Sequence, residues 1–257
     1  MILRRFLYGC LVAAIAIFTF VFNANAQLST KVMDYEIAGE PFEGYVARNE
    51  GFGDEQPIVM LIHDWNGLGT YEQKRAEMLA TQGYTVFAAD LYGKELRPKN
   101  VEESRAASGA LYGDRDLMKQ RLFAGLEVAK ELEGVDPEKV AVMGYCFGGS
   151  AVLELARAGA DLDGFVSFHG GLALPEGQDY SKTTGEVLVL HGTADPVSGM
   201  DEVTALANDL TEAGVTFDME LYGNVRHAFT PWGAGDYDPK ADLKSWDELL
   251  VFLQGIF

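Results

Sequence analysis

One cysteine of the chain lies in a setting suited to covalent catalysis. Cys146 is the centre of a Gly-Tyr-Cys-Phe-Gly pentapeptide at residues 144–148, between the mostly apolar run 139–143 and the helix-favouring segment 149–156. A strand, a tight turn and a helix in this order form a nucleophile elbow. The flanking glycines fit such a turn, because a side chain at either position would meet the neighbouring strand or helix. We therefore predict that Cys146 is a nucleophile, favoured as a thiolate by the helix N-terminus.

An acid and a histidine further along the chain complete a candidate catalytic set. Asp195 lies just beyond the strand-like run 186–190, and His227 lies in the loop after the run 217–222. Nucleophile, acid and histidine in this order are typical of α/β-hydrolases, and catalytic groups gather at the carboxyl ends of parallel strands. A free thiol, with a pKa of about 8.5, is a poor nucleophile until it is deprotonated. We expect His227 to take the thiol proton and return it to a leaving alcohol or enolate, while Asp195 orients the imidazole.

A tetrahedral intermediate in this reaction needs two hydrogen-bond donors for its oxyanion. One is expected to be the backbone N–H of Phe147, directly after the nucleophile. The other is expected in the loop that follows the apolar run 57–62, and Trp65 N–H is the candidate there.

Each of these residues also has a structural interpretation. A lone cysteine is commonly an inert buried residue, and an aspartate before a proline commonly forms a turn. Three such residues in hydrolase order, each after a predicted strand, favour the catalytic interpretation. We interpret His63 and His191 as structural residues at strand ends, and His169 as a residue that lines the pocket without a chemical role. No histidine and carboxylate pair has a convincing metal spacing, so we predict no metal.

Strand-like and helix-like segments alternate along the chain and must position these residues. Residues 31–48 predict an antiparallel pair at a sheet edge, with its turn at Glu40-Pro41. The alternation favours the α/β class, with a mostly parallel central sheet and helices on both faces. The other predicted strands are 57–62, 84–89, 140–143, 164–168, 186–190 and 217–222. The predicted helices are 71–82, 101–111, 116–132, 149–157, 200–213 and 242–254, and a turn is predicted at 134–137.

Residues 1–26 have the pattern of a secretory signal peptide. Two arginines precede the apolar run 6–21, and Ala-Asn-Ala at 24–26 is a small-x-small cleavage site. We expect cleavage there and export of a single α/β domain, residues 27–257, to the periplasm or the medium. An uncleaved membrane anchor is the alternative, for which the apolar run is short.

The charge of the chain limits its partners. The 257 residues carry a formal net charge of −19, and loss of the signal would remove two arginines and no acid. Such a surface repels nucleic acids and anionic membranes, so we expect neither as a partner after cleavage. Cleavage would also remove Cys10 and leave Cys146 as the only cysteine, which excludes an internal disulfide. We expect a monomer or a weak dimer.

Five short motifs carry a family resemblance: residues 63–67, 89–93, 144–149, 191–195 and 227–229. On these motifs the chain resembles the dienelactone hydrolase family of α/β-hydrolases over nearly all of residues 27–257. The resemblance implies the α/β-hydrolase fold and a carboxylic ester hydrolase, of the carboxymethylenebutenolidase class or close to it. It also implies a lactone, enol ester or small ester as substrate, a triad of Cys146, Asp195 and His227, and no cofactor.

Two positions depart from the family pattern. Well-known members carry a glutamate in the loop after the third strand, where it contacts the thiol and controls its ionisation. The matching residue here is Asp64, one methylene shorter, which we expect either to modulate the thiol less closely or only to cap the loop. Those members also carry an arginine shortly after the catalytic His-x-Phe that grips a substrate carboxylate, where this chain has Thr-Pro-Trp at 230–232. Arg105 matches a second carboxylate-binding arginine only loosely. Losing one arginine of a carboxylate clamp removes charge-assisted hydrogen bonds worth about 1.5–3 kcal/mol, so the sequence favours a more apolar ester at least as much as a true dienelactone. The apolar residues expected near the ester are Trp65, Tyr92, Phe147 and Trp232.

Carboxylic ester hydrolysis on a small-molecule ester or lactone is thus the function that the sequence favours. A second hypothesis is an exported thiol-based redox-sensing or binding protein that keeps the fold without efficient turnover, since an exposed thiolate is readily oxidised. The mature chain offers no second cysteine to resolve a sulfenic acid, which weighs against this hypothesis. A third is a catalytically inactive scaffold, against which the complete triad weighs.

Overall fold

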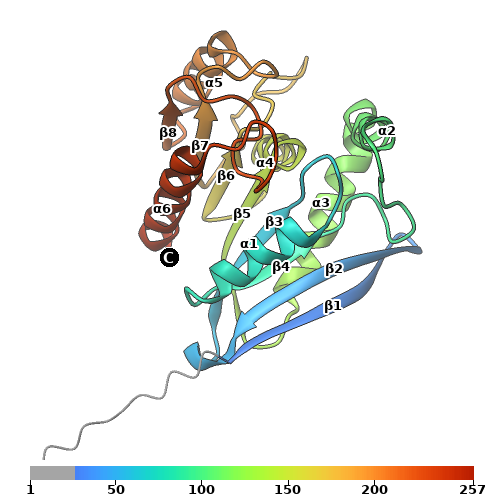
Figure 1. The fold of residues 1–257 in the computed structure, drawn as a ribbon. Helices are drawn as coiled ribbons and strands as arrows, with labels where there is room; N and C mark the ends of the chain where they lie inside the picture. Colours follow the sequence, from blue (N-terminus) through green and yellow to red (C-terminus); the bar gives the residue numbers. More distant parts are fainter. Residues whose placement is uncertain (1–26) are drawn as a thin grey trace, which may run out of the picture.

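An eight-stranded sheet organises residues 27–257, the part of the chain that the computed structural model describes (Figure 1). The predicted signal peptide, residues 1–26, lies outside the described residues. The strands, in the spatial order β1-β2-β4-β3-β5-β6-β7-β8, are β1 (Leu28–Ile37), β2 (Glu40–Asn49), β3 (Gln56–Ile62), β4 (Thr85–Ala89), β5 (Val135–Tyr145), β6 (Gly164–Phe168), β7 (Glu186–Gly192) and β8 (Phe217–Tyr222). The helices are α1 (Thr70–Ala80), α2 (Val101–Gly113), α3 (Arg115–Lys130), α4 (Phe147–Ala158), α5 (Met200–Ala213) and α6 (Pro239–Ile256), with a 3₁₀ turn at Glu50–Phe52.

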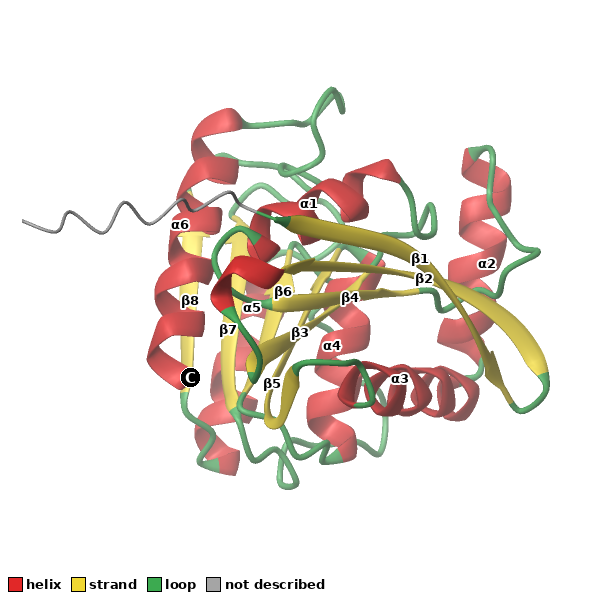
Figure 2. Cartoon of the chain, turned by 90° about the horizontal axis from the view of Figure 1, so that it is seen from below, coloured by secondary structure: helices red, strands yellow, loops and turns green. Residues whose placement is uncertain are grey.

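The pairing of the strands confirms a mostly parallel sheet with an antiparallel edge. Strands β3 to β8 pair in parallel, whereas β1 pairs with β2, and β2 with β4, in antiparallel fashion. β1 and β2 form a long twisted ribbon at that edge (Figure 2). The predicted position of its turn was wrong: Pro41 pairs with Glu36 inside the ladder, and the chain reverses at Ala38 and Gly39. Two-residue hairpin turns need positive φ, which Ala38 (52°) and Gly39 (84°) adopt and proline cannot.

The predicted turn at 134–137 is also wrong for most of its length. Val135 and Asp136 already pair with the start of β3, and the register then shifts between Pro57 and Ile58. Pro137 lies in the resulting irregularity, where its missing N–H costs no ladder hydrogen bond. Only Gly134, with φ of 72°, keeps a turn conformation.

Helices cover both faces of the sheet, as predicted (Figure 1). Along β3, Met60 belongs to the apolar cluster that α2 to α5 complete, and its neighbour Leu61 belongs to the cluster that α1 and α6 complete. Both side chains are fully buried. Strands buried on both faces explain why the sequence shows continuous apolar runs rather than alternation.

The strand order reverses between β3 and β5. The chain runs from β3 through α1 to β4, then returns over α2 and α3 to β5 on the opposite side of β3. Ligands of open parallel sheets bind outside the carboxyl ends of the strands at such a reversal. The loop that follows Ile62 and the turn at Cys146 therefore meet at the expected place for a site.

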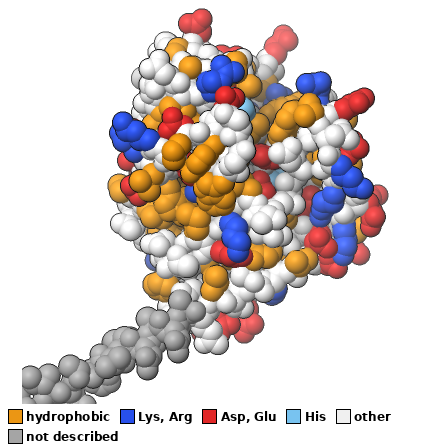
Figure 3. All heavy atoms as spheres, in the orientation of Figure 1, with side chains coloured by type: hydrophobic (Ala, Val, Ile, Leu, Met, Phe, Trp, Pro, Cys, Tyr) orange, Lys and Arg blue, Asp and Glu red, His pale blue; other side chains and the backbone are white. Residues whose placement is uncertain are grey.

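Charge is mixed rather than segregated on the face drawn in Figure 3, where acidic and basic side chains are interspersed around areas of hydrophobic side chains. Within residues 27–257, no helix has the length and apolar character needed to cross a membrane.

Candidate active site

Cys146 occupies a strained turn between β5 and α4. Its backbone angles are φ 55° and ψ −110°, and it serves as the N-cap of α4. A non-glycine residue at positive φ costs free energy and commonly marks a functional site. A Cβ added to Gly144 would lie 2.3 Å from the backbone of Gly148, and one added to Gly148 would lie 2.3 Å from the carbonyl oxygen of Ile62. The structure thus forms the elbow, for the steric reason that the glycine spacing indicated.

The structure brings Cys146, His227 and Asp195 together in one hydrogen-bonded line. His227 Nε2 lies 3.1 Å from Cys146 Sγ, and His227 Nδ1 lies 2.8 Å from Asp195 Oδ2. Asp195 follows β7 and His227 follows β8, so all three residues lie beyond the carboxyl ends of parallel strands. Asp195 is 49 positions and His227 is 81 positions after Cys146, and the three residues meet because their strands run in parallel.

The carboxylate of Asp195 is fully engaged. Oδ1 accepts hydrogen bonds from Val197 N–H (2.7 Å) and Ser198 N–H (3.2 Å), while Oδ2 faces His227. Burial raises the pKa of Asp195, but the hydrogen bond and charge of His227 outweigh it and hold the pKa below its usual value. An ionised Asp195 accepts from His227 Nδ1–H and leaves Nε2 to face the thiol.

The surroundings of His227 raise its affinity for a proton. Burial lowers the pKa of this imidazole, but hydrogen bonds and charge from Asp195 and Cys146 raise it to about 10. The imidazole is therefore placed and biased to accept a proton at Nε2, the nitrogen that faces the thiol.

Two backbone N–H groups are available to an oxyanion. Phe147 is the first residue of α4, where an N–H has no intrahelical acceptor. Trp65 N–H donates to no acceptor within residues 27–257, whereas the Trp65 carbonyl accepts a hydrogen bond from Tyr92 Oη (3.0 Å). Tyr92, predicted near the substrate, thus anchors the peptide that follows Trp65.

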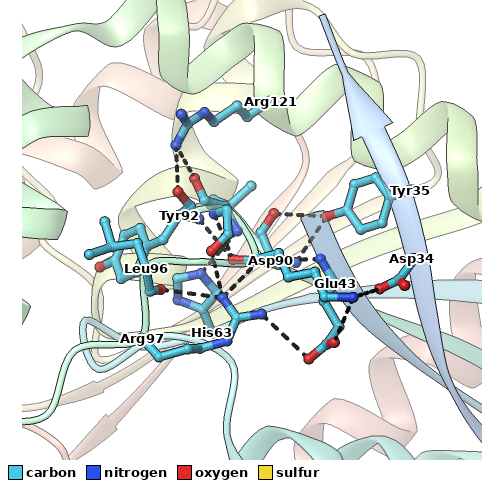
Figure 4. A network of polar contacts seen from close by, with 12 residues as sticks. Asp34, Tyr35, Glu43, His63, Asp90, Tyr92, Leu96, Arg97 and Arg121 are labelled. Atoms are coloured by element: carbon cyan, nitrogen blue, oxygen red, sulfur yellow. Dashed lines mark hydrogen bonds and ion pairs between the residues drawn. The ribbon is translucent and has the colours of Figure 1, made fainter. Parts of the chain in front are cut away.

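A buried polar network supports the loop that carries Trp65 (Figure 4). His63 Nε2 accepts a hydrogen bond from Leu91 N–H (3.1 Å), so its proton lies on Nδ1, which donates to the carbonyl of Asp64 (2.6 Å). Burial keeps the pKa of His63 below its usual value. Asp90, also buried, accepts from Tyr92 N–H (2.9 Å) and joins the following turn to the network. His63 therefore holds the loops after β3 and β4 together.

The three remaining predicted site residues are one buried carboxylate and two exposed side chains. The carboxylate of Asp64 is buried and accepts hydrogen bonds from Asn66 N–H (2.6 Å) and Nδ2–H (3.2 Å), with none joining it to Cys146. Burial raises the pKa of Asp64, opposed mainly by these bonds. Arg105 lies exposed on α2, with no hydrogen bond or ion pair to the three residues above. Trp232 is 44% exposed and packs over the Arg75 guanidinium, 4.4 Å from the ring centroid.

Sequence reasoning missed residues whose importance depends on packing. Glu72 is buried and accepts from Gly69 N–H (2.9 Å) and Asp64 N–H (3.4 Å), which braces the loop at both ends. Burial and the neighbouring Asp64 raise the pKa of Glu72 to about 8. Its position three residues into the helix is the signal of a capping box, but only once the start of α1 is known. His169, assigned no chemical role, lies with its ring edge-on to His227 at 5.3 Å.

Within the described residues, no group of three or more histidine, cysteine or acidic side chains is arranged to hold a metal ion.

The sheet, its strand order and the elbow define the protein as an α/β-hydrolase. Residues 42–257 match the dienelactone hydrolase family, and the chain belongs to that family. It is therefore an enzyme that hydrolyses ester bonds, with small esters or lactones as substrates.

Relatives cover nearly the whole chain. A protein of Aquifex aeolicus (strain VF5) named "Putative carboxymethylenebutenolidase" is 27% identical over 232 residues, 87% of this chain and 97% of the relative. A Bradyrhizobium sp. protein named "Probable 2-oxo-3-(5-oxofuran-2-ylidene)propanoate lactonase" is 24% identical over 242 residues, 90% of this chain and 96% of the relative. The solved structure of a dienelactone hydrolase-like promiscuous phosphotriesterase from metagenomic libraries is 30% identical. It covers 90% of this chain and 99% of its own, with a TM-score of 0.84.

Proposed function

We propose that this hydrolase cleaves its ester through a Cys146 nucleophile, with His227 as general base and acid and Asp195 as the residue that orients His227. The observation that carries the proposal is the line Asp195–His227–Cys146, with contacts of 2.8 and 3.1 Å. The raised pKa of His227 supports its role as the acceptor of the thiol proton.

The chemical steps follow from this arrangement. The Cys146 thiol passes its proton to His227 Nε2, and Sγ attacks the ester carbonyl to form a C–S bond. The N–H groups of Phe147 and Trp65 stabilise the oxyanion. Collapse breaks the C–O bond, and His227 returns the proton to the leaving oxygen. His227 then deprotonates a water that cleaves the thioester, which releases the acid and restores the thiol.

We propose a neutral ester or lactone as the preferred substrate. The segment after His227 offers Thr230 and Trp232 where the family resemblance implied a carboxylate-binding arginine. Thr230 is fully buried, and Trp232 packs on the already ion-paired Arg75. Arg105 is exposed on α2 and has no hydrogen bond or ion pair to Cys146, His227 or Asp195. The names of the relatives support lactones, and the solved relative adds a phosphotriester to the substrates worth testing.

The test is hydrolysis of p-nitrophenyl acetate, a neutral lactone, an anionic dienelactone and a neutral phosphotriester by residues 27–257. Cys146→Ser and His227→Ala are the matched variants, and circular dichroism checks that they fold. We expect turnover of the neutral carboxylic esters that falls by at least about 10³-fold in both variants. Turnover that survives in Cys146→Ser and His227→Ala would refute the proposed triad. Preference for the anionic dienelactone would refute the substrate proposal alone.

The same experiment distinguishes the thiol-sensor hypothesis. That hypothesis requires reversible peroxide oxidation of Cys146 together with no ester turnover by the wild type. Family membership favours turnover.

We also propose that the enzyme is exported and that residues 1–26 are removed. β1 begins at Leu28, so cleavage after Ala26 would leave the sheet intact. Expression of the full chain in a bacterial host should give a periplasmic or secreted protein whose N-terminal residue is Gln27. An intact N-terminus in the membrane fraction would support the anchor instead.

A further inference from the structure

His169 is held in an unusual conformation next to the proposed catalytic base. It follows β6 with φ of 39°, a region that non-glycine residues rarely adopt, and its side chain is completely buried. Its ring packs edge-on against His227 at 5.3 Å and against Phe229 at 5.1 Å. A strained, buried polar residue persists only when its surroundings hold it, and the contacts of His169 show how.

A directional hydrogen-bond chain ends at His169. Arg75 Nε–H donates to Tyr71 Oη (3.2 Å), Tyr71 Oη–H donates to Thr230 Oγ1 (2.7 Å), and Thr230 Oγ1 lies 2.8 Å from His169 Nε2. A guanidinium only donates, and each hydroxyl has one proton to give. Arg75 donates to Tyr71 and Tyr71 donates to Thr230, so the Thr230 hydroxyl keeps its own proton to offer to His169 Nε2.

Burial decides the charge state of His169. Its Nδ1 has no hydrogen-bond partner within residues 27–257. Burial and the nearby His227 hold the pKa of His169 well below its usual value. The ring thus stays neutral, and an imidazolium at His227 meets no like charge from it. The titratable groups around His169 are His227, Asp195, His191 and Tyr145.

The same series of hydrogen bonds also holds the loop that carries His227. Thr230 lies three residues after His227, and its carbonyl accepts a hydrogen bond from the Arg75 guanidinium (3.1 Å). Arg75 is in turn paired with Asp242 on α6. The hydroxyl of Thr230 therefore connects the loop that carries His227 to His169, whose ring packs on the His227 imidazole.

We propose that His169 is a positioning residue for the reaction, held by Thr230, Tyr71 and Arg75 so that its ring keeps the His227 imidazole aligned with both Asp195 and Cys146. This inference rests on the proposed function. Thr230 acts through His169 and touches none of the reacting atoms.

Thr230→Val and Thr230→Ser form the decisive pair of variants. Valine keeps the volume of threonine but removes the hydroxyl, whereas serine keeps the hydroxyl and loses a methyl group. We expect Thr230→Val to lower kcat by about 10-fold with little change in KM, because small misplacements of a catalytic group lower rate rather than binding. We also expect its pH–rate profile to shift relative to the wild type. Thr230→Ser should recover kcat to within about threefold and restore the profile.

Tyr71→Phe removes the hydrogen bond to Thr230, one step further from His169. It provides a second test if Thr230→Val does not fold. It should lower kcat in the same direction and shift the same profile. Wild-type kcat and pH profile in every folded variant would overturn the proposal. So would equal impairment of Thr230→Ser and Thr230→Val, which would point to packing alone.

Alkylation of Cys146 by iodoacetamide gives a readout that does not need turnover. Its rate against pH reports the coupling of the thiol to His227 even if the wild type hydrolyses no ester. A shifted alkylation profile in Thr230→Val, restored in Thr230→Ser, would support the positioning inference on its own. An unchanged profile would overturn it, whatever the outcome for ester hydrolysis.

Discussion

At the scale of single residues, Cys146 and His227 depend on each other. The thiol is presented by a strained backbone, and the imidazole is held between the thiol and Asp195. Removing Asp195 would leave its two companions in place but free the imidazole to adopt the wrong tautomer. A substitution of Asp195 therefore tests its chemical role while Cys146 and His227 stay in position.

Asp195→Asn should lower kcat by about 10³–10⁴-fold with a smaller change in KM. The amide still fills the site and accepts from Val197 N–H, but it no longer selects Nδ1–H at His227. Steady-state kinetics on a neutral ester measure the effect, and thermal unfolding checks the fold. Activity within about tenfold of the wild type would contradict the role assigned to Asp195.

The protonation of His227 should also appear in stability. Its folded pKa of about 10 lies above the ordinary value of 6.5, so the native state binds the proton more tightly than the unfolded chain. The resulting stabilisation is fully present below about pH 6.5 and is lost as the pH rises towards 10. The free energy of unfolding of the wild type minus that of His227→Gln should therefore shrink across this window. Denaturant unfolding at several pH values measures it, and a constant difference would count against the raised pKa.

At the scale of elements, the contact between the elbow and β3 sets the position of the nucleophile. Gly148 lies so close to the end of β3 that any side chain would collide with backbone atoms, which cannot rotate away. The same closeness brings the start of α4 next to the loop of Trp65. One contact between elements thus positions both candidate oxyanion donors.

Gly148→Ala should cost at least about 2 kcal/mol of stability and lower activity by about 10²-fold, because α4 must shift to admit the methyl group. Gly109→Ala is the matched control. Gly109 lies inside α2 with no atom within 4 Å of the added Cβ, so alanine there should raise stability by about 0.5–1 kcal/mol without affecting activity. Chemical denaturation and ester kinetics measure both variants. Equal effects at the two positions would contradict the steric argument.

At the scale of the whole molecule, a buried ion pair joins distant parts of the chain. Arg75 on α1 pairs with Asp242 on α6, with side chains that are 2% and 9% exposed. The guanidinium also lies against the rings of Tyr71, Trp232 and Trp246. This cluster connects the two helices that cover the same face of the sheet, and the loop of His227 passes over it.

Asp242→Asn should destabilise the fold by about 3–5 kcal/mol, because it leaves a buried guanidinium without its counter-charge. Asp236→Asn is the matched control, since Asp236 pairs with Arg226 at 3.0 Å where both side chains are about half exposed. The control should cost no more than about 1 kcal/mol. Denaturant unfolding compares the two variants, and similar losses would show that burial does not decide the strength of these pairs.

Sequence alone determined the features that depend on local chemistry. The glycine spacing around Cys146, the apolar runs and the order of Cys146, Asp195 and His227 predicted the elbow, the parallel sheet and the candidate triad. These signals are readable because backbone sterics and strand burial act over a few residues. Helix and strand boundaries followed within a few positions, apart from the turns near Pro41 and Pro137, where the ladder tolerates proline at an edge or an irregularity.

Only the tertiary structure decided which side chains support that triad. His169, Thr230, Tyr71 and Glu72 carry no distinctive motif, and Arg105, suggested by resemblance, proved exposed. Hydrogen bonds such as that from Tyr71 to Thr230 join residues 159 positions apart. They form only after strand order and helix packing have brought α1 beside the loop of His227. A polar residue acquires its role from the partner that folding supplies, and no local pattern in the sequence specifies that partner.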